Sequence, residues 1–299
     1  MRTGHGGAAA GGAGTGQGRR GIEKMTLPDV TLNNGVRMPQ LGFGVWQVSD
    51  EDVVDAVSVA LETGYRSIDT AAGYGNERGV GEALSRAGLD REDVFVTSKL
   101  ANDDHGYDHA LRAFDTTMKN LHLEVLDLYL IHWPLPARDL YVPTWRALER
   151  LYAEGRVRAI GVSNFQRPHL ERVMDEGGII PMVNQIELHP LLDQRDLREF
   201  HAEHHIATEA WSPLGRGYLL EHPVIVDIAE QMERTPAQVL LRWHIQLGNV
   251  AIPKSVTPER IESNFRIDDF ELSRADMDRI DGIDEDKRFG PHPDEFDGR

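Results

Sequence analysis

The sequence of 299 residues contains no cysteine. Disulfide bonds, thiolate metal sites and cysteine nucleophiles are therefore excluded together, and the absence is compatible with a cytoplasmic location. No apolar run reaches the length of about 18 residues that a transmembrane helix needs. Basic residues are outnumbered by acidic ones, and the formal net charge of -17 argues against nonspecific binding to nucleic acid or to an anionic membrane. We therefore expect a globular cytoplasmic protein that captures any anionic ligand in a local basic pocket.

The first 24 residues differ from the rest of the chain, because they are mostly Gly and Ala and include Arg19 and Arg20. Such a segment cannot bury a core, so we expect a disordered extension, with Met25 as an alternative first residue. No linker rich in Pro, Gly or Ser interrupts residues 26–287. We interpret residues 25–299 as a single domain.

Eight short apolar runs each end on a polar or ligand-type residue, and amphipathic stretches lie between most of them. This alternation predicts parallel strands joined by helices, in a (β/α)8 TIM barrel. In such a barrel the active site lies at the carboxyl ends of the strands. The runs cover residues 40–44, 65–69, 94–99, 126–132, 158–164, 182–187, 206–212 and 250–254.

Additional elements are expected at both ends of the barrel. The segment Asn33-Asn34-Gly35 lies between two short apolar stretches, where Asn-Gly supplies the positive φ angles of a tight β-hairpin turn. This hairpin would cover the amino-terminal end of the barrel. Acidic residues after Ser49 and a proline after Thr235 predict helix starts. Two extra C-terminal helices are expected near 258–264 and 273–284, and the long interval from 211 to 254 leaves room for another loop and helix.

Four residues at or near neighbouring strand ends suggest proton donation to a carbonyl oxygen. Asp69, Lys99 and His132 end three successive strands, and Tyr74 follows Asp69 on a glycine-flanked loop. A phenol with a pKa near ~10 is a poor acid, but an adjacent ammonium stabilises the phenolate and lowers that pKa. Asp69 would keep Lys99 charged, and His132 would hydrogen-bond the substrate. These groups supply no electron pair, so a reduction would need a cofactor.

Each of these residues also has an ordinary structural explanation. Asp69 and Lys99 could form a buried ion pair, while His132 could be a core residue and Tyr74 a surface aromatic.

A second group of residues suits a phosphate group, because two cations and a hydroxyl lie at the start of a helix. These residues are Lys254, Ser255 and Arg260. The alternative there is a solvated helix start with ordinary surface charges.

Three ordered motifs resemble the signatures of the aldo-keto reductases, over about residues 27–297. They are the segments 64–81, Ala159-Ile160-Gly161-Val162-Ser163-Asn164-Phe165, and Ile252-Pro253-Lys254-Ser255 continuing to Asn264. The segments Leu41-Gly42-Phe43-Gly44-Val45-Trp46 and Gly290-Pro291-His292-Pro293-Asp294 resemble the bacterial 2,5-diketo-D-gluconate reductase-like branch. By this resemblance the chain is a barrel enzyme that transfers a hydride from NADPH to a small carbonyl substrate without metal or flavin.

The resemblance also implies roles for individual residues. Tyr74 is the general acid, Lys99 and Asp69 tune it, and His132 orients the carbonyl. Ser163, Asn164 and Gln185 hold the nicotinamide carboxamide, and Trp211 stacks on the ring where many relatives have Tyr. The remaining residues implied for NADPH are Ser212, Leu214, Gly215, Lys254, Ser255, Val256, Arg260 and Asn264, with the cationic cluster on the 2'-phosphate.

The sequence departs from the family at several positions. Relatives often carry a Glu that contacts the adenine where Ser263 stands, and many have an aromatic residue where Ala101 stands. Trp46, Asn102 and Trp133 are our candidates for substrate contact, with Phe289 as a further candidate. An apolar wall with few polar groups suits small aldehydes, ketoaldehydes and diketones.

Two other functions remain open from the residues alone. Lys99 could act as a Schiff-base nucleophile in a lyase, although a close carboxylate would keep its amine charged. The chain could also be a noncatalytic NADP-binding regulatory module. Two groups of histidines could in principle bind a metal ion, but we interpret them as solvated helix faces and expect no metal site. They are the pair His105 and His109, and the group His201, His204 and His205. By its resemblance we expect a monomer.

Overall fold

The fold was analysed in a computed structural model, which describes Met1 and residues 27–298. The Gly/Ala-rich extension predicted for residues 1–24 lies, apart from Met1, outside the described residues, and so does Met25. Within the described residues, no helix combines the length and the apolar character needed to cross a membrane.

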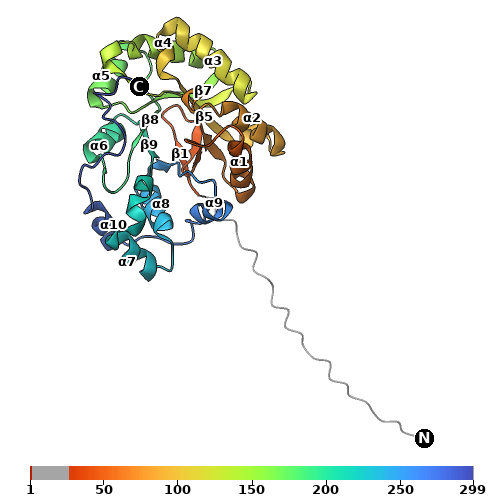
Figure 1. Cartoon of the computed structure of the whole chain (residues 1–299), viewed down its shortest axis with the longest axis vertical. Coiled ribbons are helices and arrows are strands. Elements are labelled where there is room, and N and C mark those ends of the chain that lie inside the picture. The colour runs from red at the N-terminus through yellow and green to blue at the C-terminus, as the bar shows by residue number, and fades with distance from the viewer. Residues whose placement is uncertain (2–26, 299) are drawn as a thin grey trace.

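Eight parallel strands form one sheet that closes on itself, which confirms the predicted barrel. The first and last strands meet where Leu41 pairs with Ala251. There the Gly42 amide donates to the Ala251 carbonyl at 2.9 Å, and the Ala251 amide donates to Gln40 at 2.9 Å. Figure 1 shows the strands in the middle of the molecule with helices around them. The strands are β3 (Phe43–Gly44), β4 (Ser67–Asp69), β5 (Phe95–Leu100), β6 (Leu126–Ile131), β7 (Val157–Ser163), β8 (Val183–Glu187), β9 (Ala207–Trp211) and β10 (Val250–Ala251).

The predicted N-terminal hairpin is present and consists of β1 (Asp29–Thr31) and β2 (Arg37–Pro39). Its turn differs from the expectation, because Gly35 has a positive φ of 88° and neither Asn33 nor Asn34 does. The Gly35 amide donates to the Leu32 carbonyl at 2.8 Å. This is a three-residue hairpin loop in which only the last residue needs the left-handed region.

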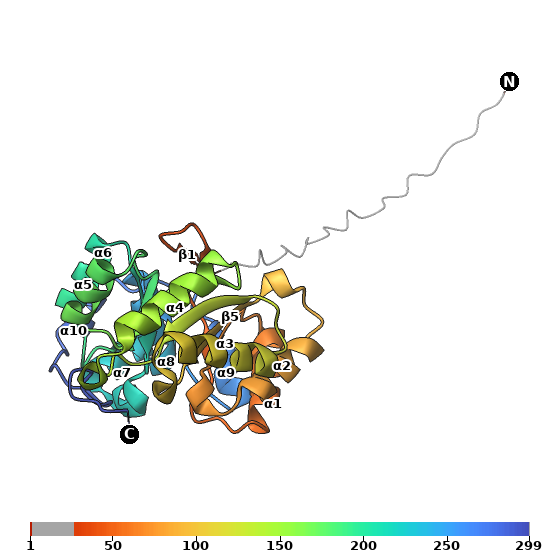
Figure 2. The same cartoon turned by 90° about the horizontal axis from the view of Figure 1, so that it is seen from above.

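The hairpin covers the amino-terminal end of the barrel, as predicted. The Asn33 side chain donates to the Pro181 carbonyl at 3.2 Å, just before β8. Beyond the hairpin, the Gln40 amide donates to the carbonyls of Ile245 and Asn249 at 2.9 and 3.0 Å, just before β10. In Figure 2 the hairpin strand β1 lies on one side of the barrel and the dark blue C-terminal segment on the other.

Seven helices follow seven of the barrel strands, and the two starts predicted after Ser49 and Thr235 are present. Thr235 forms a capping box with Gln238, and the Ser49 hydroxyl accepts a hydrogen bond from the Asp52 amide at 3.0 Å. These helices are α1 (Asp52–Thr63), α2 (Glu77–Arg86), α3 (Tyr107–Leu121), α4 (Tyr141–Ala153), α5 (Arg167–Glu176), α6 (Arg195–Glu203) and α8 (Pro236–Gln246). The predicted additions are also present: the 3₁₀ segment η5 (Gly215–Glu221) with α7 (Pro223–Gln231), and the tail helices α9 (Pro258–Phe265) and α10 (Arg274–Asp281).

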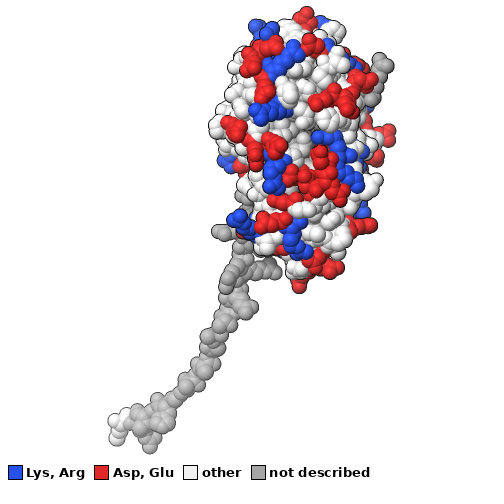
Figure 3. All heavy atoms as spheres, turned by 90° about the vertical axis from the view of Figure 1, so that its left-hand side faces the viewer, with Lys and Arg blue, Asp and Glu red and all other residues white. Residues whose placement is uncertain are grey.

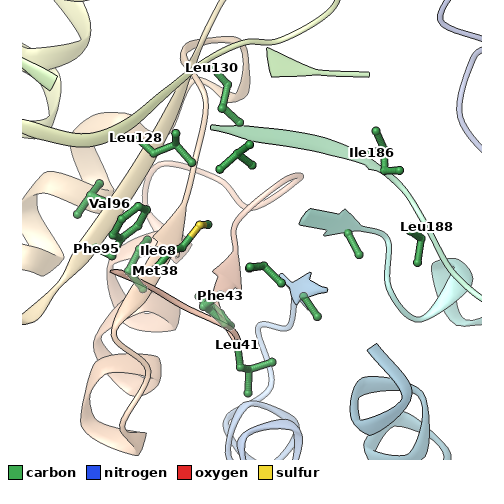
Figure 4. Close-up of a cluster of buried hydrophobic side chains, with 14 of the residues drawn as sticks. Met38, Leu41, Phe43, Ile68, Phe95, Val96, Leu128, Leu130, Ile186 and Leu188 are labelled. Atoms are coloured by element: carbon green, nitrogen blue, oxygen red, sulfur yellow. The ribbon is translucent and has the colours of Figure 1, made fainter. Parts of the chain in front are cut away.

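The strands are buried on both faces, which explains why they read as continuous apolar runs in the sequence. Every residue of β5 and β6 is buried. Figure 4 shows part of this core, where Phe43, Ile68, Val96 and Leu128 come from four successive strands. Polar residues within the strands are therefore costly to bury unless they are paired. Asp127 at the start of β6, for example, is 1% exposed and pairs with Arg91 and Arg158.

Charges of both signs are interspersed on the outside. On the face shown in Figure 3, which carries α5, α6 and α10, Lys and Arg alternate with Asp and Glu. Arg167 and Arg172 on α5 pair with Glu171 and Glu176 at the spacing of one helical turn. This face has no continuous basic area of the kind that a polyanion would need.

Candidate active site

The four residues predicted to carry the chemistry meet at the carboxyl end of the barrel. Lys99 Nζ donates to Asp69 Oδ1 at 2.6 Å, to the Thr70 carbonyl at 3.0 Å and to Tyr74 Oη at 3.3 Å. Asp69 is the last residue of β4 and Lys99 the second-last residue of β5, while Tyr74 ends the 3₁₀ turn η1 (Ala72–Tyr74). The rings of Tyr74 and His132 lie edge to face with their centroids 5.6 Å apart. The phenol, ammonium, carboxylate and imidazole therefore form one contiguous cluster.

Lys99 stays charged although it is fully buried. Burial acts to lower the pKa of Lys99. The charge of Asp69 acts in the opposite direction, as do Tyr74 and Glu209, and the net effect is a raised pKa. The ion pair with Asp69 is closed to solvent, with the two side chains 0% and 2% exposed. A buried charge of this kind persists only when it is paired and hydrogen-bonded.

The pKa of Tyr74 moves in the direction opposite to the sequence-based expectation. Burial raises the pKa of Tyr74 above its ordinary value, and the nearby Lys99 ammonium offsets only part of that rise. The sequence-based expectation correctly had Lys99 lowering the pKa of Tyr74, but it left out the larger rise in that pKa caused by desolvation. Tyr74 is consequently a protonated phenol at neutral pH, with a cation in place to stabilise the phenolate once the proton leaves.

His132 is a neutral imidazole. Burial, followed by the positive charge of Lys99, lowers the pKa of His132 to about 3. A neutral ring carries one N–H, and it can donate that hydrogen to an uncharged carbonyl oxygen without charge repulsion from Lys99.

Sequence reasoning missed a second carboxyl group beneath the cluster. Gln185 Nε2 donates to Asp69 Oδ2 and to Glu209 Oε2, both at 2.8 Å. Glu209 lies inside β9 and is 0% exposed. Burial, then the charge of Asp69, raises the pKa of Glu209 to about 8. The available signal was an acidic residue in the middle of a buried strand, flanked by Thr208 and Ala210.

The residues that the resemblance assigns to the nicotinamide lie next to the cluster. Asn164, with a positive φ of 63°, follows β7, and its Nδ2 donates to the His132 carbonyl at 2.9 Å. Ser163 Oγ donates to the Gln185 carbonyl at 2.9 Å. Trp211 Nε1 donates to Asn164 Oδ1 at 2.8 Å, a contact that the sequence did not suggest. The indole is thereby fixed in orientation against the wall of the cavity.

A cavity of about 1240 Å³ opens over these groups. Among its walls are the predicted residues Trp46, Asp69, Tyr74, Asn102, His132, Trp133, Ser163, Asn164, Gln185, Trp211, Ser212, Leu214, Lys254, Ser255, Val256, Arg260 and Asn264. Three predicted residues, Lys99, Gly215 and Phe289, are not in the wall. Lys99 lies beneath it, and Gly215 is buried, where an added Cβ would approach Leu219 to 2.8 Å.

The outer end of the cavity carries the cationic cluster. Lys254 and Arg260 are exposed and form no ion pair within residues 27–298, and Ser255 is 9% exposed. The Ser255 hydroxyl accepts a hydrogen bond from the Thr257 amide at 3.1 Å, just before α9 begins. The two unpaired cations thus lie beside a helix N-terminus, and phosphate binding at this position stays a prediction.

The C-terminal segment contributes Pro291 and Phe296 to the wall of the cavity. Phe296 lines the cavity and packs on Trp133 with ring centroids 4.5 Å apart. Phe289, a substrate candidate from the sequence, instead stacks on Tyr218 of η5 with centroids 4.9 Å apart, and it is not in the cavity wall. Asn102 Oδ1 is buried without a hydrogen-bond partner in the described chain.

Glu187 at the end of β8 fixes this C-terminal segment. Its carboxylate accepts hydrogen bonds from the backbone amides of Phe289 and Gly290 at 2.7 and 2.9 Å. His189 contacts the same carboxylate at 3.1 Å. The Gly290 backbone lies so close to the indole that an added Cβ would be 2.6 Å from Trp211. Glu187 ends one of the apolar runs of the sequence, but the sequence did not indicate its partners, because they are backbone groups about one hundred residues away.

The histidines considered for metal binding are accounted for individually. His105 is buried and His109 is exposed. His201 is buried between Asn184 and Thr208, each 2.9 Å from a ring nitrogen. His105 and His201 therefore correct the expectation of solvated helix faces. Within residues 27–298 no group of three or more potential ligands is placed to hold a metal ion.

Comparisons with known proteins all match this chain to aldo-keto reductases. The Aldo/keto reductase family model matches residues 39–285. An aldo-keto reductase of Mycobacterium sp. (strain JLS) is 55% identical over 272 residues, covering 91% of this chain and 99% of the relative. Methylglyoxal reductase DkgA of Escherichia coli (strain K12) is 51% identical over 271 residues, covering 90% and 98%.

Solved structures agree with this assignment. An aldo/keto reductase from Brucella melitensis has a TM-score of 0.84 at 55% identity, covering 87% of this chain and 100% of that one. A mutant of Gox0644 in complex with NADPH has a TM-score of 0.88 at 48% identity, covering 91% and 99%. With a closed barrel, a phenol beside a buried ammonium at its carboxyl end, and this likeness over almost its whole described length, the chain belongs to the aldo/keto reductase family.

Proposed function

We propose that this protein is an NADPH-dependent reductase of small aldehydes, ketoaldehydes or diketones, with Tyr74 as the general acid. The observation that carries the proposal is the placement of Tyr74 Oη, 3.3 Å from Lys99 Nζ and in the wall of the cavity beside His132. The methylglyoxal reductase and the NADPH complex among the similar proteins support the substrate class and the cofactor.

The polar groups of the cavity fit NADPH. Both hydrogens of Gln185 Nε2 are used by carboxyl groups, and Oε1 receives no hydrogen bond within residues 27–298. That oxygen is an acceptor suited to the amide hydrogens of a nicotinamide carboxamide. At the other end, Lys254 and Arg260 supply unpaired charge suited to a ribose phosphate. When bound, NADPH supplies the hydride that adds to the carbonyl carbon.

The residues of the chain handle the proton and the charge. As the carbonyl carbon gains a hydride, its π electron pair moves to oxygen, and Tyr74 Oη donates its proton to that oxygen. The phenolate left on Tyr74 is stabilised by the Lys99 ammonium, which Asp69 holds in place. Neutral His132 donates a hydrogen bond to the same substrate oxygen and fixes its direction. The low solvent exposure of the cluster strengthens each of these interactions.

The direct test follows the absorbance of NADPH in the presence of methylglyoxal, a diketogluconate and a panel of aldehydes. We expect oxidation of NADPH with at least one small carbonyl compound, and much slower oxidation of NADH. Cofactor binding is measured separately by tryptophan fluorescence. An enzyme that binds NADPH and turns over no member of the panel would contradict the proposal.

Two other functions are less well supported. A Schiff-base lyase needs a neutral amine, whereas Asp69 keeps Lys99 charged. Borohydride trapping of a carbonyl compound on Lys99 would favour that function. A noncatalytic NADP-binding module has no need of the intact phenol, ammonium and carboxylate cluster.

A further inference from the structure

Two buried carboxyl groups and one ammonium lie on the floor of the cavity. Asp69 receives the Lys99 ammonium at 2.6 Å. Glu209 receives only the neutral Gln185 amide, at 2.8 Å, and its Oε1 has no hydrogen-bond partner in the described chain. A second ionised carboxylate without a cation would be expensive at 0% exposure. One of the two acids must therefore hold a proton, and the geometry favours Glu209.

The groups that face Glu209 come from across the barrel. The charged or titratable ones are Asp69 on β4, Tyr74 on η1 and Lys99 on β5, and the polar one is Gln185 on β8. Neighbouring β10 contributes only Val250 and Ala251. The imidazoles of the helices packed outside β9 are occupied elsewhere: His201 of α6 contacts Thr208, and His244 of α8 contacts the Pro213 carbonyl at 3.1 Å. The charge state of Glu209 is thus linked to the catalytic cluster.

We propose that Glu209 is a positioning residue for carbonyl reduction: as a neutral acid it holds Gln185 in one orientation, and when ionised it makes Tyr74 a weaker acid. This inference rests on the proposed function. Orientation follows from the shared amide, because Gln185 can satisfy both carboxyls only by turning its Nε2 toward them and its Oε1 away.

The electrostatic part follows from the sign of the added charge. A negative charge on Glu209 disfavours the phenolate and raises the pKa of Tyr74 further. A general acid with a higher pKa gives up its proton less readily, so reduction slows when Glu209 ionises. Burial, with Asp69 as the next cause, raises the pKa of Glu209 to about 8, which places this change within the range of enzyme assays.

The first experiment compares pH profiles of kcat for methylglyoxal reduction in the wild type and in Glu209→Gln. Gln keeps an acceptor oxygen for Gln185 but cannot ionise. We expect wild-type kcat to fall above a pH of about 8, and the midpoint of this fall to move upward by about one pH unit or more in the variant. Glu62→Gln, the same change at an exposed position of α1, is the matched control and should keep the wild-type midpoint. Identical midpoints in wild type and Glu209→Gln would overturn the electrostatic role.

The second experiment does not depend on turnover. Infrared difference spectra of the NADPH complex should show the band of a protonated carboxyl group at pH 7, which Glu209→Gln removes and which disappears above a pH of about 8. Glu209→Leu, which has no acceptor for Gln185, should weaken NADPH binding about fivefold, whereas Glu209→Gln should not. A folded wild type without the band, or equal binding by both variants, would overturn the proposal. A normal band and binding pattern without any carbonyl turnover would support the positioning role and contradict the proposed function instead.

Discussion

The floor and the rim of the cavity are built in different ways. On the floor, Asp69, Lys99, Gln185 and Glu209 are at most 2% exposed, and every one of them is hydrogen-bonded to another member of the group. On the rim, Trp46 and Val256 are 42% and 52% exposed. The floor projects from strands that are paired with a neighbour on each side, while the rim belongs to loops. This difference suggests that the reaction depends on the floor, and that cofactor choice and substrate range depend on the rim.

The largest effect is expected from the phenol. Tyr74→Phe removes the proton donor but keeps the ring, and kcat for carbonyl reduction should fall by about 10²–10⁴-fold. NADPH affinity should stay close to the wild-type value, because the hydroxyl contacts Lys99 and not the groups assigned to the cofactor. Steady-state kinetics together with a fluorescence titration check both parts. Simultaneous loss of NADPH binding would contradict the separation between the acid and the cofactor site.

The second largest effect is expected on the free energy of unfolding, when the ion pair of the floor is broken. Lys99→Met leaves the buried Asp69 carboxylate without its cation, which should reduce the free energy of unfolding by about 3–5 kcal/mol. The surface pair Arg150–Glu154 offers a control, since solvent screens an exposed pair and Glu154→Gln should change that free energy far less. Urea denaturation measures both variants. Equal effects would show that the floor is no more dependent on pairing than the surface.

At the outer rim we expect a change in cofactor preference with an unchanged chemical step. The double variant Lys254→Met with Arg260→Leu removes both unpaired cations, and KM for NADPH should rise about 10–100-fold. KM for NADH should change little, because NADH lacks the 2'-phosphate, and kcat should be retained. A parallel rise for both cofactors would mean that these residues do not distinguish them.

The smallest effect is expected where the floor and the rim meet. Glu187→Gln replaces a carboxylate that binds two backbone amides, so one amide at Phe289 or Gly290 would face an NH₂ group. Hydrogen exchange in residues 288–296 should become faster, and KM for the carbonyl substrate should rise about three- to tenfold. Exchange in β5 should not change. Unchanged exchange in the C-terminal segment would show that it is held by its aromatic contacts instead.

The floor could be predicted from the sequence more fully than the rim. Strands buried on both faces leave long apolar runs, and the polar residue that ends each run is then placed by the geometry of the barrel, as for Lys99 and His132. The direction of the pKa shift of Tyr74 could not be derived, because it depends on how deeply the phenol is buried. Contacts of the C-terminal segment, such as Phe296 on Trp133, depend on loop conformation and leave no periodic pattern. Glu209 was visible in the sequence but was read as part of an apolar run.

The hydrogen bonds between Glu187 and the C-terminal segment have a practical consequence for how the protein can be joined to other molecules. The chain enters the described barrel at residue 27, beside the hairpin, and it leaves through a segment that crosses the mouth of the cavity. A fusion partner or a surface attachment at the amino end would leave the mouth open to substrate. The same attachment at the carboxyl end would pull on the segment that carries Phe296, so tethering at the two ends should give immobilised preparations of unequal catalytic quality.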